Sequence, residues 1–170
     1  LMYEGGGACY VRVIMQATYS YLVEAEMGKE FVEDFQPLYS PKTMLEMGVL
    51  EGKYCNDCRA EYPKSWFIHA KVADKPDPLI NYFGIKSRQP LNIWQEKGWI
   101  IGPDPRGWFQ WYCRYFLGRR LPKIDSKQIK RWRAFSRHAG QVRANCEPGD
   151  WNCRPRQRQA LLQWAHDPLI

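Results

Sequence analysis

The sequence predicts an all-α protein, and three observations lead to that class. Apolar residues recur at helical spacing in several segments, Pro and Gly separate these segments, and patterns typical of strands are too few for a sizeable sheet. With 170 residues, 45% of them hydrophobic and 15% aromatic, the chain can bury a core within one domain. We therefore expect a compact bundle of short helices around one central aromatic helix.

The N-terminal residues 1–39 are expected to form an acidic helical appendage to an all-α basic domain at 40–170. Residues 8–27 place apolar side chains at helical spacing, and 29–35 continue as a second helix. The β-branched Val11 and Val13 leave a strand as the alternative for the first of these segments.

Short helices bounded by Pro and Gly are expected between residues 40 and 97. Ser40 can cap the first of them, Pro41 fits its first position and Gly48 suits its end. The residues from 71 to 89 lack a helical period, but their apolar and aromatic side chains favour an ordered loop that packs on the domain. The expected helices are 40–48, 53–62, 63–70 and 90–97, and Trp99 is expected to contact Trp94 across the end of the last.

The stretch DPRGWFQWYCRYFLGRR, which begins at Asp104, predicts the central helix at about 105–117. Asp104 can cap its free N–H groups, and Gly118 suits the left-handed residue after its end. Because the helix is apolar on almost every side, it belongs in the middle of the core, with Trp111 and Cys113 buried. We expect its one polar stripe to be its most exposed face. That stripe consists of Arg106, Gln110 and Arg114.

Two further helices complete the bundle, a long basic one at about 124–144 and a C-terminal one at about 155–165. Charge is unevenly spread along the chain, whose net charge is +7. Residues 86–170 hold 17 basic and six acidic side chains, for a net charge of +11, whereas residues 1–39 carry a net charge of −4. A positive charge of this size suits nucleic acid, DNA or RNA, or another polyanion as partner.

Arginines at the start of the C-terminal helix sharpen this expectation. Arg154, Arg156 and Arg158 fall in its first turn, where the helix dipole disfavours cations but free N–H groups and arginines together suit a phosphate. The alternative is that Glu147 and Asp150, just upstream, neutralise them. The predicted nucleic-acid-binding residues are Arg119, Arg120, Lys123, Lys127, Lys130, Arg133, Arg137, Arg154, Arg156 and Arg158.

The six cysteines leave three states open. Cys55 and Cys58 have the spacing of a zinc knuckle, and Cys146 and Cys153 could complete a four-cysteine zinc site, although their spacing is wide for such a pair. The other states are a Cys146–Cys153 disulfide and buried thiols, of which we favour the thiols, and we expect no cofactor. So few cysteines suggest a reducing intracellular compartment, cytoplasm or nucleus, and no segment resembles a membrane span.

Recognisable catalytic motifs are absent from the sequence, so enzymatic activity stays open. Asp57 and Glu61 have the spacing of an acid–base pair on a helix, but two solvated carboxylates are the simpler interpretation. Our leading hypothesis is a nucleic-acid-binding protein that uses a basic C-terminal helical surface to contact phosphates. The alternatives are a structural or interaction subunit of a protein or ribonucleoprotein assembly, and an enzyme acting on nucleic acid or nucleotides.

Residues from about 44 to 168 resemble an uncharacterised protein family without known function. The resemblance depends on EMGVLEGKYCNDC, INYFG, DPRGWFQWYCRY and CRPRQRQALLQWA. It implies no activity, ligand or site, and suggests only that 44–168 form the unit and that 1–39 are an added segment.

Overall fold

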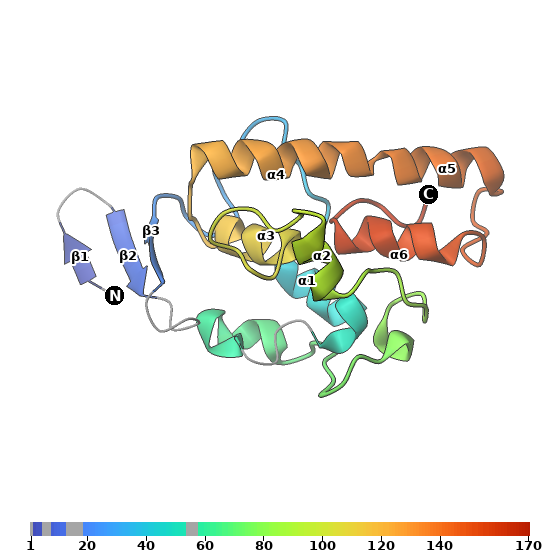
Figure 1. Ribbon diagram of the computed structural model, residues 1–170, viewed down its shortest axis with the longest axis horizontal. Helices are drawn as coiled ribbons and strands as arrows, with labels where there is room; N and C mark the ends of the chain where they lie inside the picture. The colour runs from blue at the N-terminus through green and yellow to red at the C-terminus, as the bar shows by residue number, and fades with distance from the viewer. Residues whose placement is uncertain (1, 5–7, 13–18, 54–57) are drawn as a thin grey trace.

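The computed structural model describes residues 2–4, 8–12, 19–53 and 58–170, and most of its regular structure is helical, as the sequence predicts (Figure 1). Single 3-10 turns are found at Leu50–Gly52, Arg59–Glu61, Lys64–Phe67 and Pro78–Ile80. The α-helices are α1 (Pro41–Met47), α2 (Leu91–Glu96), α3 (Trp108–Phe116), α4 (Pro122–Phe135), α5 (Arg137–Asn145) and α6 (Pro155–Gln163).

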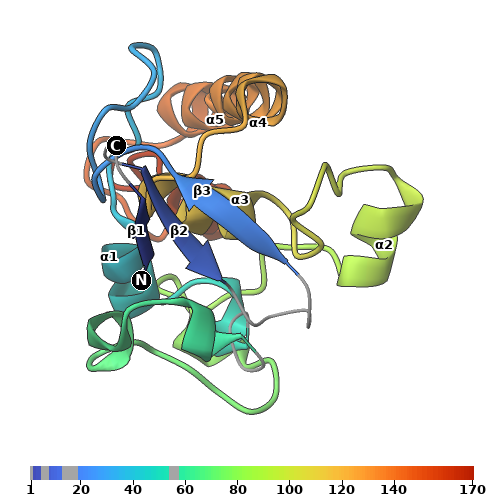
Figure 2. The same cartoon turned by 90° about the vertical axis from the view of Figure 1, so that its left-hand side faces the viewer.

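The helices are arranged around α3. Figure 1 shows α4 and α5 almost in line along one edge, with α6 beneath α5 and α3 near the middle of the molecule. Turned by 90°, the structure shows α2 standing apart from the other helices on one side (Figure 2). The N-terminal strands lie at the end of the molecule opposite α5 and α6, so the C-terminal helices meet no described strand there.

The start of the chain does not form the predicted helix at 8–27. Instead β2 (Ala8–Arg12) pairs antiparallel with β3 (Ser20–Val23) and with β1 (Met2–Glu4) in a three-stranded sheet. Aromatic and β-branched side chains favour this pairing over an isolated helix. Val23 also bridges to Arg119, which joins the sheet to the segment after α3.

The predicted helix at 29–35 is also wrong, because this segment is held in an irregular path over the end of α3. The backbone N–H groups of Glu24 and Gly28 donate to the carbonyls of Gly118 and Phe116, at 2.8 Å each. This path carries Phe35 into the centre of the core, where it is 1% exposed. A residue of the predicted appendage is therefore part of the main core.

The two N-terminal helices aside, several boundaries match the sequence patterns. The Ser40 side chain caps α1, and Gly48 ends it with a φ of 108°. After α2, Gly98 has a φ of 66° and the N–H of Trp99 donates to the carbonyl of Trp94 at 2.9 Å, which is the expected helix ending. The predicted helices at 53–62 and 63–70 are reduced, in their described residues, to two 3-10 turns, and residues 54–57 lie outside the described part.

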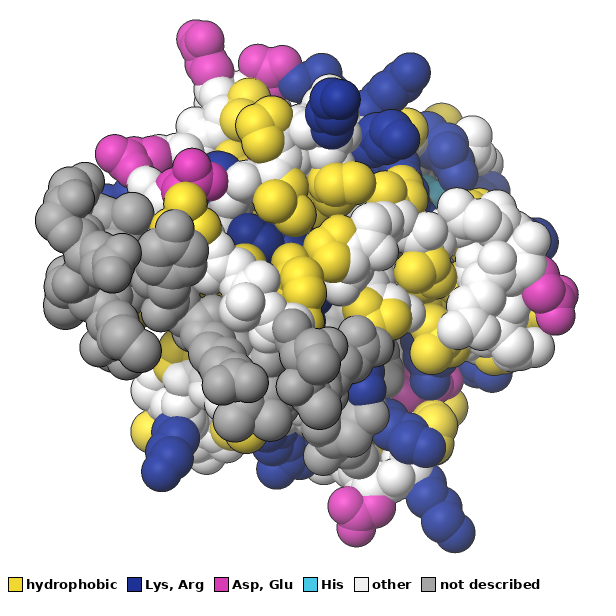
Figure 3. Space-filling view, turned by 60° about the vertical axis from the view of Figure 1, so that its left-hand side comes forward, with side chains coloured by type: hydrophobic (Ala, Val, Ile, Leu, Met, Phe, Trp, Pro, Cys, Tyr) yellow, Lys and Arg dark blue, Asp and Glu magenta, His cyan; other side chains and the backbone are white. Residues whose placement is uncertain are grey.

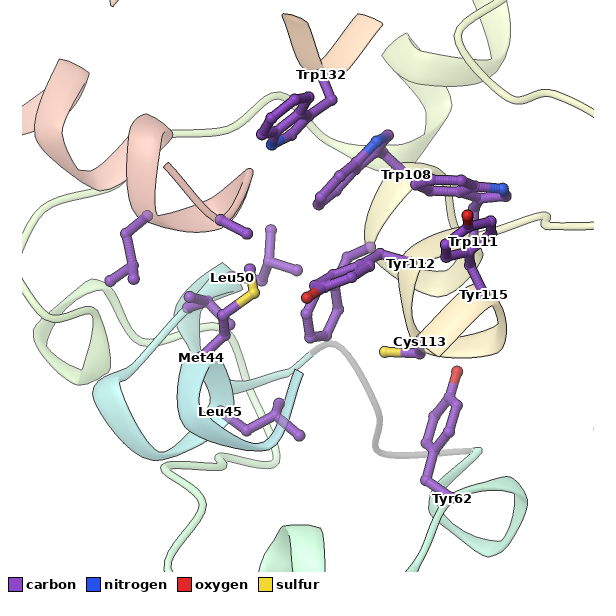
Figure 4. Close-up of a cluster of buried hydrophobic side chains, with 14 of the residues drawn as sticks. Met44, Leu45, Leu50, Tyr62, Trp108, Trp111, Tyr112, Cys113, Tyr115 and Trp132 are labelled. Carbon is purple, nitrogen blue, oxygen red and sulfur yellow. The ribbon is translucent and has the colours of Figure 1, made fainter. Parts of the chain in front are cut away.

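The core is built from aromatic rings on α3 (Figure 4). Trp111 and Cys113 are fully buried, which confirms the prediction for these two residues. The ring of Phe35 lies between 5.0 and 6.5 Å from five rings on α3 and α4, and most of these pairs meet edge to face, an arrangement that aromatic quadrupoles favour. The five rings are those of Trp108, Trp111, Tyr112, Tyr115 and Trp132.

Contrary to expectation, two of the three residues of the predicted polar stripe face inward, and the third, Arg106, precedes α3 and is partly exposed. Gln110 is completely buried and Arg114 is 1% exposed. Asp104 does not cap α3, which begins only at Trp108 after a turn closed by the Gly107 N–H and the Asp104 carbonyl. The helical pattern could not predict this burial, because the carboxylates that bind Arg114 come from outside α3. One is Glu61, 53 residues earlier, and the other is Asp104, in the turn before the helix.

A buried ionic network explains why these polar side chains can leave water. Arg114 donates from Nε to Glu61 Oε1 at 2.6 Å and from Nη1 to Asp104 Oδ1 at 2.7 Å. The other oxygen of Asp104 accepts from Arg119 Nη2, also at 2.7 Å. Two guanidinium groups thus share one carboxylate, and each of the four side chains is almost completely buried.

The predicted long helix at 124–144 is interrupted at Ser136. There the N–H of Ser136 donates to the carbonyl of Arg133, and the N–H of Ala139 to that of Ser136, which are 3-10-type bonds. The interruption separates α4 from α5 and lies between Phe135 and Arg137.

We predict that Asp104→Asn lowers the free energy of unfolding by about 3–5 kcal/mol, because the change leaves two buried guanidinium groups without their shared charge. Urea unfolding measures this decrease. Asp34→Asn is the control, since it removes an exposed ion pair with Arg133 and should cost less than about 1 kcal/mol. Equal decreases for the two variants would contradict the structural role of the network.

Trp111→Ala should lower the free energy of unfolding by about 3–5 kcal/mol, the usual cost of truncating a large buried aromatic side chain. The indole of Trp111 is completely buried and its Nε1 donates to Asp125 Oδ1 at 2.8 Å. Trp151→Ala serves as the matched control because Trp151 is 52% exposed. A decrease below about 1 kcal/mol for Trp111→Ala would show that the core does not depend on this ring.

Candidate nucleic-acid interface

An exposed stripe of cations runs along α4. Lys123, Lys127 and Lys130 follow one another at spacings of four and three, so they share one face of the helix, and all three are exposed. Ala134 continues the same face, and Arg137 is exposed just beyond the interruption. Figure 3 shows lysine and arginine side chains gathered along the upper edge of the molecule, over α4, beside acidic ones.

Arg133, on the neighbouring side of α4, does not belong to this free stripe. It forms an ion pair with Asp34, from the segment that crosses α3. The acidic N-terminal residues thus neutralise one predicted phosphate contact, and they leave the cations on the other side of the helix without a described carboxylate partner.

Three other predicted binding residues hold the chain together instead. Arg119 belongs to the buried ionic network. Arg120 donates from Nη1 to the carbonyl of Tyr115 at 2.6 Å and from Nη2 to that of Lys29 at 2.9 Å. Arg158 is completely buried, and donates to backbone carbonyls at 2.7–3.0 Å, so it offers no surface to a phosphate. The carbonyls bound by Arg158 belong to Asp150, Cys153, Pro168 and Ile170.

The predicted arginine cluster at the start of α6 is therefore incomplete. Arg156 is exposed and Arg154 is partly exposed, whereas Arg158 points into the protein. The alternative was that the carboxylates of Glu147 and Asp150 neutralise all three arginines. It does not apply to Arg158, which binds the backbone carbonyl of Asp150 and not its carboxylate.

Beside the stripe lies a cleft of about 810 Å³. It is bounded by the 86–89 loop, by α2 and Trp99, by the start of α3, by the α4–α5 junction and by α6. The stripe on α4 leads into this cleft, because Ala134 and Arg137 line it. The charged, histidine and aromatic side chains of this lining include Lys86, Arg88, Trp94, Trp99, Trp108, Arg131, Phe135, Arg137, His138, Arg156 and Trp164.

The lining of the cleft is positively charged. Five of its side chains are Lys or Arg, and the described residues that line it include no Asp or Glu. Arg88 is neutralised by the buried Glu51, which does not line the cleft and whose Oε2 lies 2.6 Å from Arg88 Nη2. The other four, Lys86, Arg131, Arg137 and Arg156, form no ion pair with any described carboxylate.

Arg131 occupies a central position in this lining. Its Nη1 donates to the carbonyl of Trp99 and to Gln128 Oε1, both at 2.9 Å, and its guanidinium lies 5.4 Å from the centre of the Trp164 ring. Burial lowers the pKa of Arg131, because removal from water disfavours the charged form. A half-buried cation in such surroundings attracts an anion strongly.

Aromatic rings form the rest of the lining. Trp164 is stacked between Phe135, at 4.3 Å, and Trp108, at 4.7 Å, so this ladder of rings reaches from the core to the edge of the cleft. Trp94 lies against Gly107, where a Cβ atom would come within 3.2 Å of the indole and the φ of +87° disfavours any other residue. Trp99 is 39% exposed, and the ammonium of the exposed Lys97 lies 4.9 Å from the centre of its ring.

His138 gives the lining a side chain whose ordinary pKa lies close to neutrality. Its pKa is lowered first by burial and then by the charges of Arg137 and His166. The surroundings of His138 therefore favour the neutral imidazole, whereas an anion bound beside it would favour the protonated form.

The other predicted chemistry is not assembled. Cys146 and Cys153 form a disulfide, so they are not both available as zinc ligands, while Cys58 lies buried in the core and Cys55 lies outside the described residues. Among the described residues, no three His, Cys, Asp or Glu side chains are placed to hold a metal ion. Of the suggested acid–base pair, Asp57 is likewise outside the described residues and Glu61 is bound to Arg114.

The disulfide, which corrects our preference for buried thiols at these two positions, does not fit the expected reducing compartment well. In the described part of the chain, none of the helices combines the length and the apolar character needed to cross a membrane.

Sequence reasoning found the stripe but missed the cleft. The polar and aromatic lining residues come from five separate segments, and nothing in the spacing of Lys86, Trp99 or Arg131 connects them. The one available signal was the abundance of Trp beside Arg and Lys in the basic half of the chain. No protein-family model, curated protein or solved structure matches the chain, so its function has to be inferred from the geometry of this site.

We predict that Arg137→Gln raises the pKa of His138, because it removes a positive charge that disfavours the imidazolium. An NMR titration of the His138 ring measures the change. Lys64→Gln, at an exposed position outside the cleft, removes the same formal charge and should leave the titration unchanged. A lower pKa in Arg137→Gln would contradict the placement of these two side chains.

Proposed function

We propose that the protein binds nucleic acid, with the exposed cations of α4 and α5 on the phosphate backbone and the cleft beside them as part of the same surface. The observation that carries the proposal is the cleft lining, in which four cations meet no described carboxylate. A cleft lined by charges of one sign focuses the electric field and attracts ligands of the opposite sign, and a basic patch of this kind is the electrostatic footprint of nucleic-acid-binding proteins.

The spacing of the stripe suits a backbone. At 1.5 Å per residue, Lys123 and Lys130 are about 10 Å apart along the helix, and Arg137 extends the row to about 20 Å. A nucleic-acid strand that runs along this row of side chains can place several successive phosphates beside cations. Contacts of this kind supply affinity without identifying bases, so the stripe by itself favours no sequence.

The double variant Lys127→Gln/Lys130→Gln should weaken binding of single-stranded and duplex oligonucleotides roughly tenfold in low salt, because it removes two cations from the stripe. It should also reduce the slope of log K against log salt by about one unit for each phosphate that no longer meets a cation. Fluorescence anisotropy with labelled oligonucleotides across a salt series measures both effects.

The matched control is Lys64→Gln/Lys75→Gln, which removes the same charge from exposed positions outside the stripe and the cleft. It should retain the parental affinity and slope. If the parent binds no oligonucleotide in low salt, the proposal fails and an interaction subunit for acidic protein becomes the better hypothesis. Equal weakening by both double variants would show that only net charge matters and would contradict a defined surface.

A further inference from the structure

We infer that the cleft is a subsite for one unpaired nucleotide, which would make single-stranded nucleic acid the preferred ligand. This inference rests on the proposed function, because the stripe on α4 is what would deliver a strand to the cleft. It goes further by assigning a base and a phosphate to separate groups of lining residues.

The size of the cleft fits this ligand. Its volume of about 810 Å³ lies within the range of roughly 300–1,000 Å³ that is usual for small-molecule sites. A base inside a duplex is stacked and paired, so it would have to leave the helix to enter such a cleft, which carries an energetic cost. An already unpaired base avoids that cost.

The accessible aromatic surface gives a base its place. Trp164 is stacked with both Phe135 and Trp108, and the Arg131 guanidinium lies 5.4 Å from its ring centre, so this ring is already packed against protein side chains. Trp99, by contrast, is 39% exposed, and the group over its ring is the ammonium of Lys97, 4.9 Å from the ring centre, on a long exposed side chain that can move aside for a base. Every base has a π-face that can stack on such a ring, and an indole offers the largest platform. We therefore assign the base to Trp99.

The cations of the lining give a phosphate its place. Arg131 donates to the backbone carbonyl of Trp99, so its guanidinium is held near the residue to which we assign the base, in the same cleft lining. Arg137 and Arg156 are exposed on the same lining. Arg131 offers N–H groups in a planar fork, which matches phosphate oxygens well. A nucleotide would thus neutralise a half-buried charge while its base covers an exposed ring.

The test uses adenosine 5′-monophosphate as a probe that lacks a continuous backbone. Calorimetry on the full chain should show that this nucleotide binds more tightly than adenosine or inorganic phosphate alone. Trp99→Ala should weaken its binding about five- to a hundredfold, the range expected when one base–aromatic stack is removed. Trp99→Phe should retain most of the affinity, because a smaller ring still stacks.

Two controls separate the site from general effects. Trp151→Phe changes an exposed tryptophan that does not line the cleft and should leave nucleotide affinity unchanged. Arg131→Gln should weaken the nucleotide more than adenosine, because it removes charge and not the stacking surface. A circular dichroism spectrum like that of the parent confirms that each variant is folded.

The outcomes distinguish this inference from the proposed function. Lys127→Gln/Lys130→Gln should weaken oligonucleotides but leave adenosine 5′-monophosphate binding unchanged, whereas Trp99→Ala should also reduce the preference for single strands over duplex. If oligonucleotides bind and depend on the lysines, but the nucleotide does not bind or Trp99→Ala has no effect, the subsite is refuted and the proposed function stands. If the nucleotide binds through Trp99 but no oligonucleotide binds, the cleft assignment stands and the proposed function is refuted.

Discussion

The carboxylate of Asp104, shared by two buried guanidinium groups, is the interaction on which the rest of the structure depends. Through Arg114 it fixes the last turn of α3, and Glu61, bound to the same arginine, attaches the 3-10 turn to which it belongs. Through Arg119 it fixes the segment after α3, and the backbone of Arg119 forms a β-bridge with Val23 of the N-terminal sheet. Three segments that are distant in sequence, around residues 23, 61 and 104–119, are therefore joined at or beside one buried group. A buried ion pair adds little net stability, whereas a buried charge that loses its partner is strongly destabilising. The main effect of the network is therefore to specify one arrangement of these segments.

The position of α3 in turn determines the cleft. Trp108, in its first turn, donates from Nε1 to the carbonyl of Gln128 on α4 and supports Trp164, which supports Phe135 at the α4–α5 junction. One side of the cleft is thus an extension of the aromatic core. The other side depends on Gly107, the residue before α3, against which Trp94 lies. A rigid scaffold with an accessible ring at its edge is suited to binding, because little side-chain freedom has to be given up when a ligand arrives.

The sequence predicts those parts of the fold whose determinants are local. Ser40, Gly48 and Gly98 mark real helix ends, and the apolar character of α3 does place it in the core. The predictions fail where distant partners decide. Arg114 is charged and looks like a surface residue until Glu61 and Asp104 are placed beside it, and residues 20–23 become a strand because a neighbouring strand is present to pair with them. The cleft is likewise not predictable from local sequence, since only tertiary structure brings Arg131 to Trp99.

The arginines of the basic half show how net charge and binding surface differ. Arg119, Arg120 and Arg158 direct their guanidinium groups at a carboxylate or at backbone carbonyls inside the protein, so their charges stabilise the path of the chain. Arg131 uses only part of its donor set on the protein, and Arg137 and Arg156 are exposed at the same cleft. The positive charge of this half of the chain is therefore divided between two tasks by the availability of carbonyl and carboxylate acceptors. Where acceptors are plentiful the arginines bind the chain, and where the described residues provide few, at the cleft, the cations are left for an external anion. That division, and not the total charge, is what makes the cleft and its adjoining stripe the candidate binding surface.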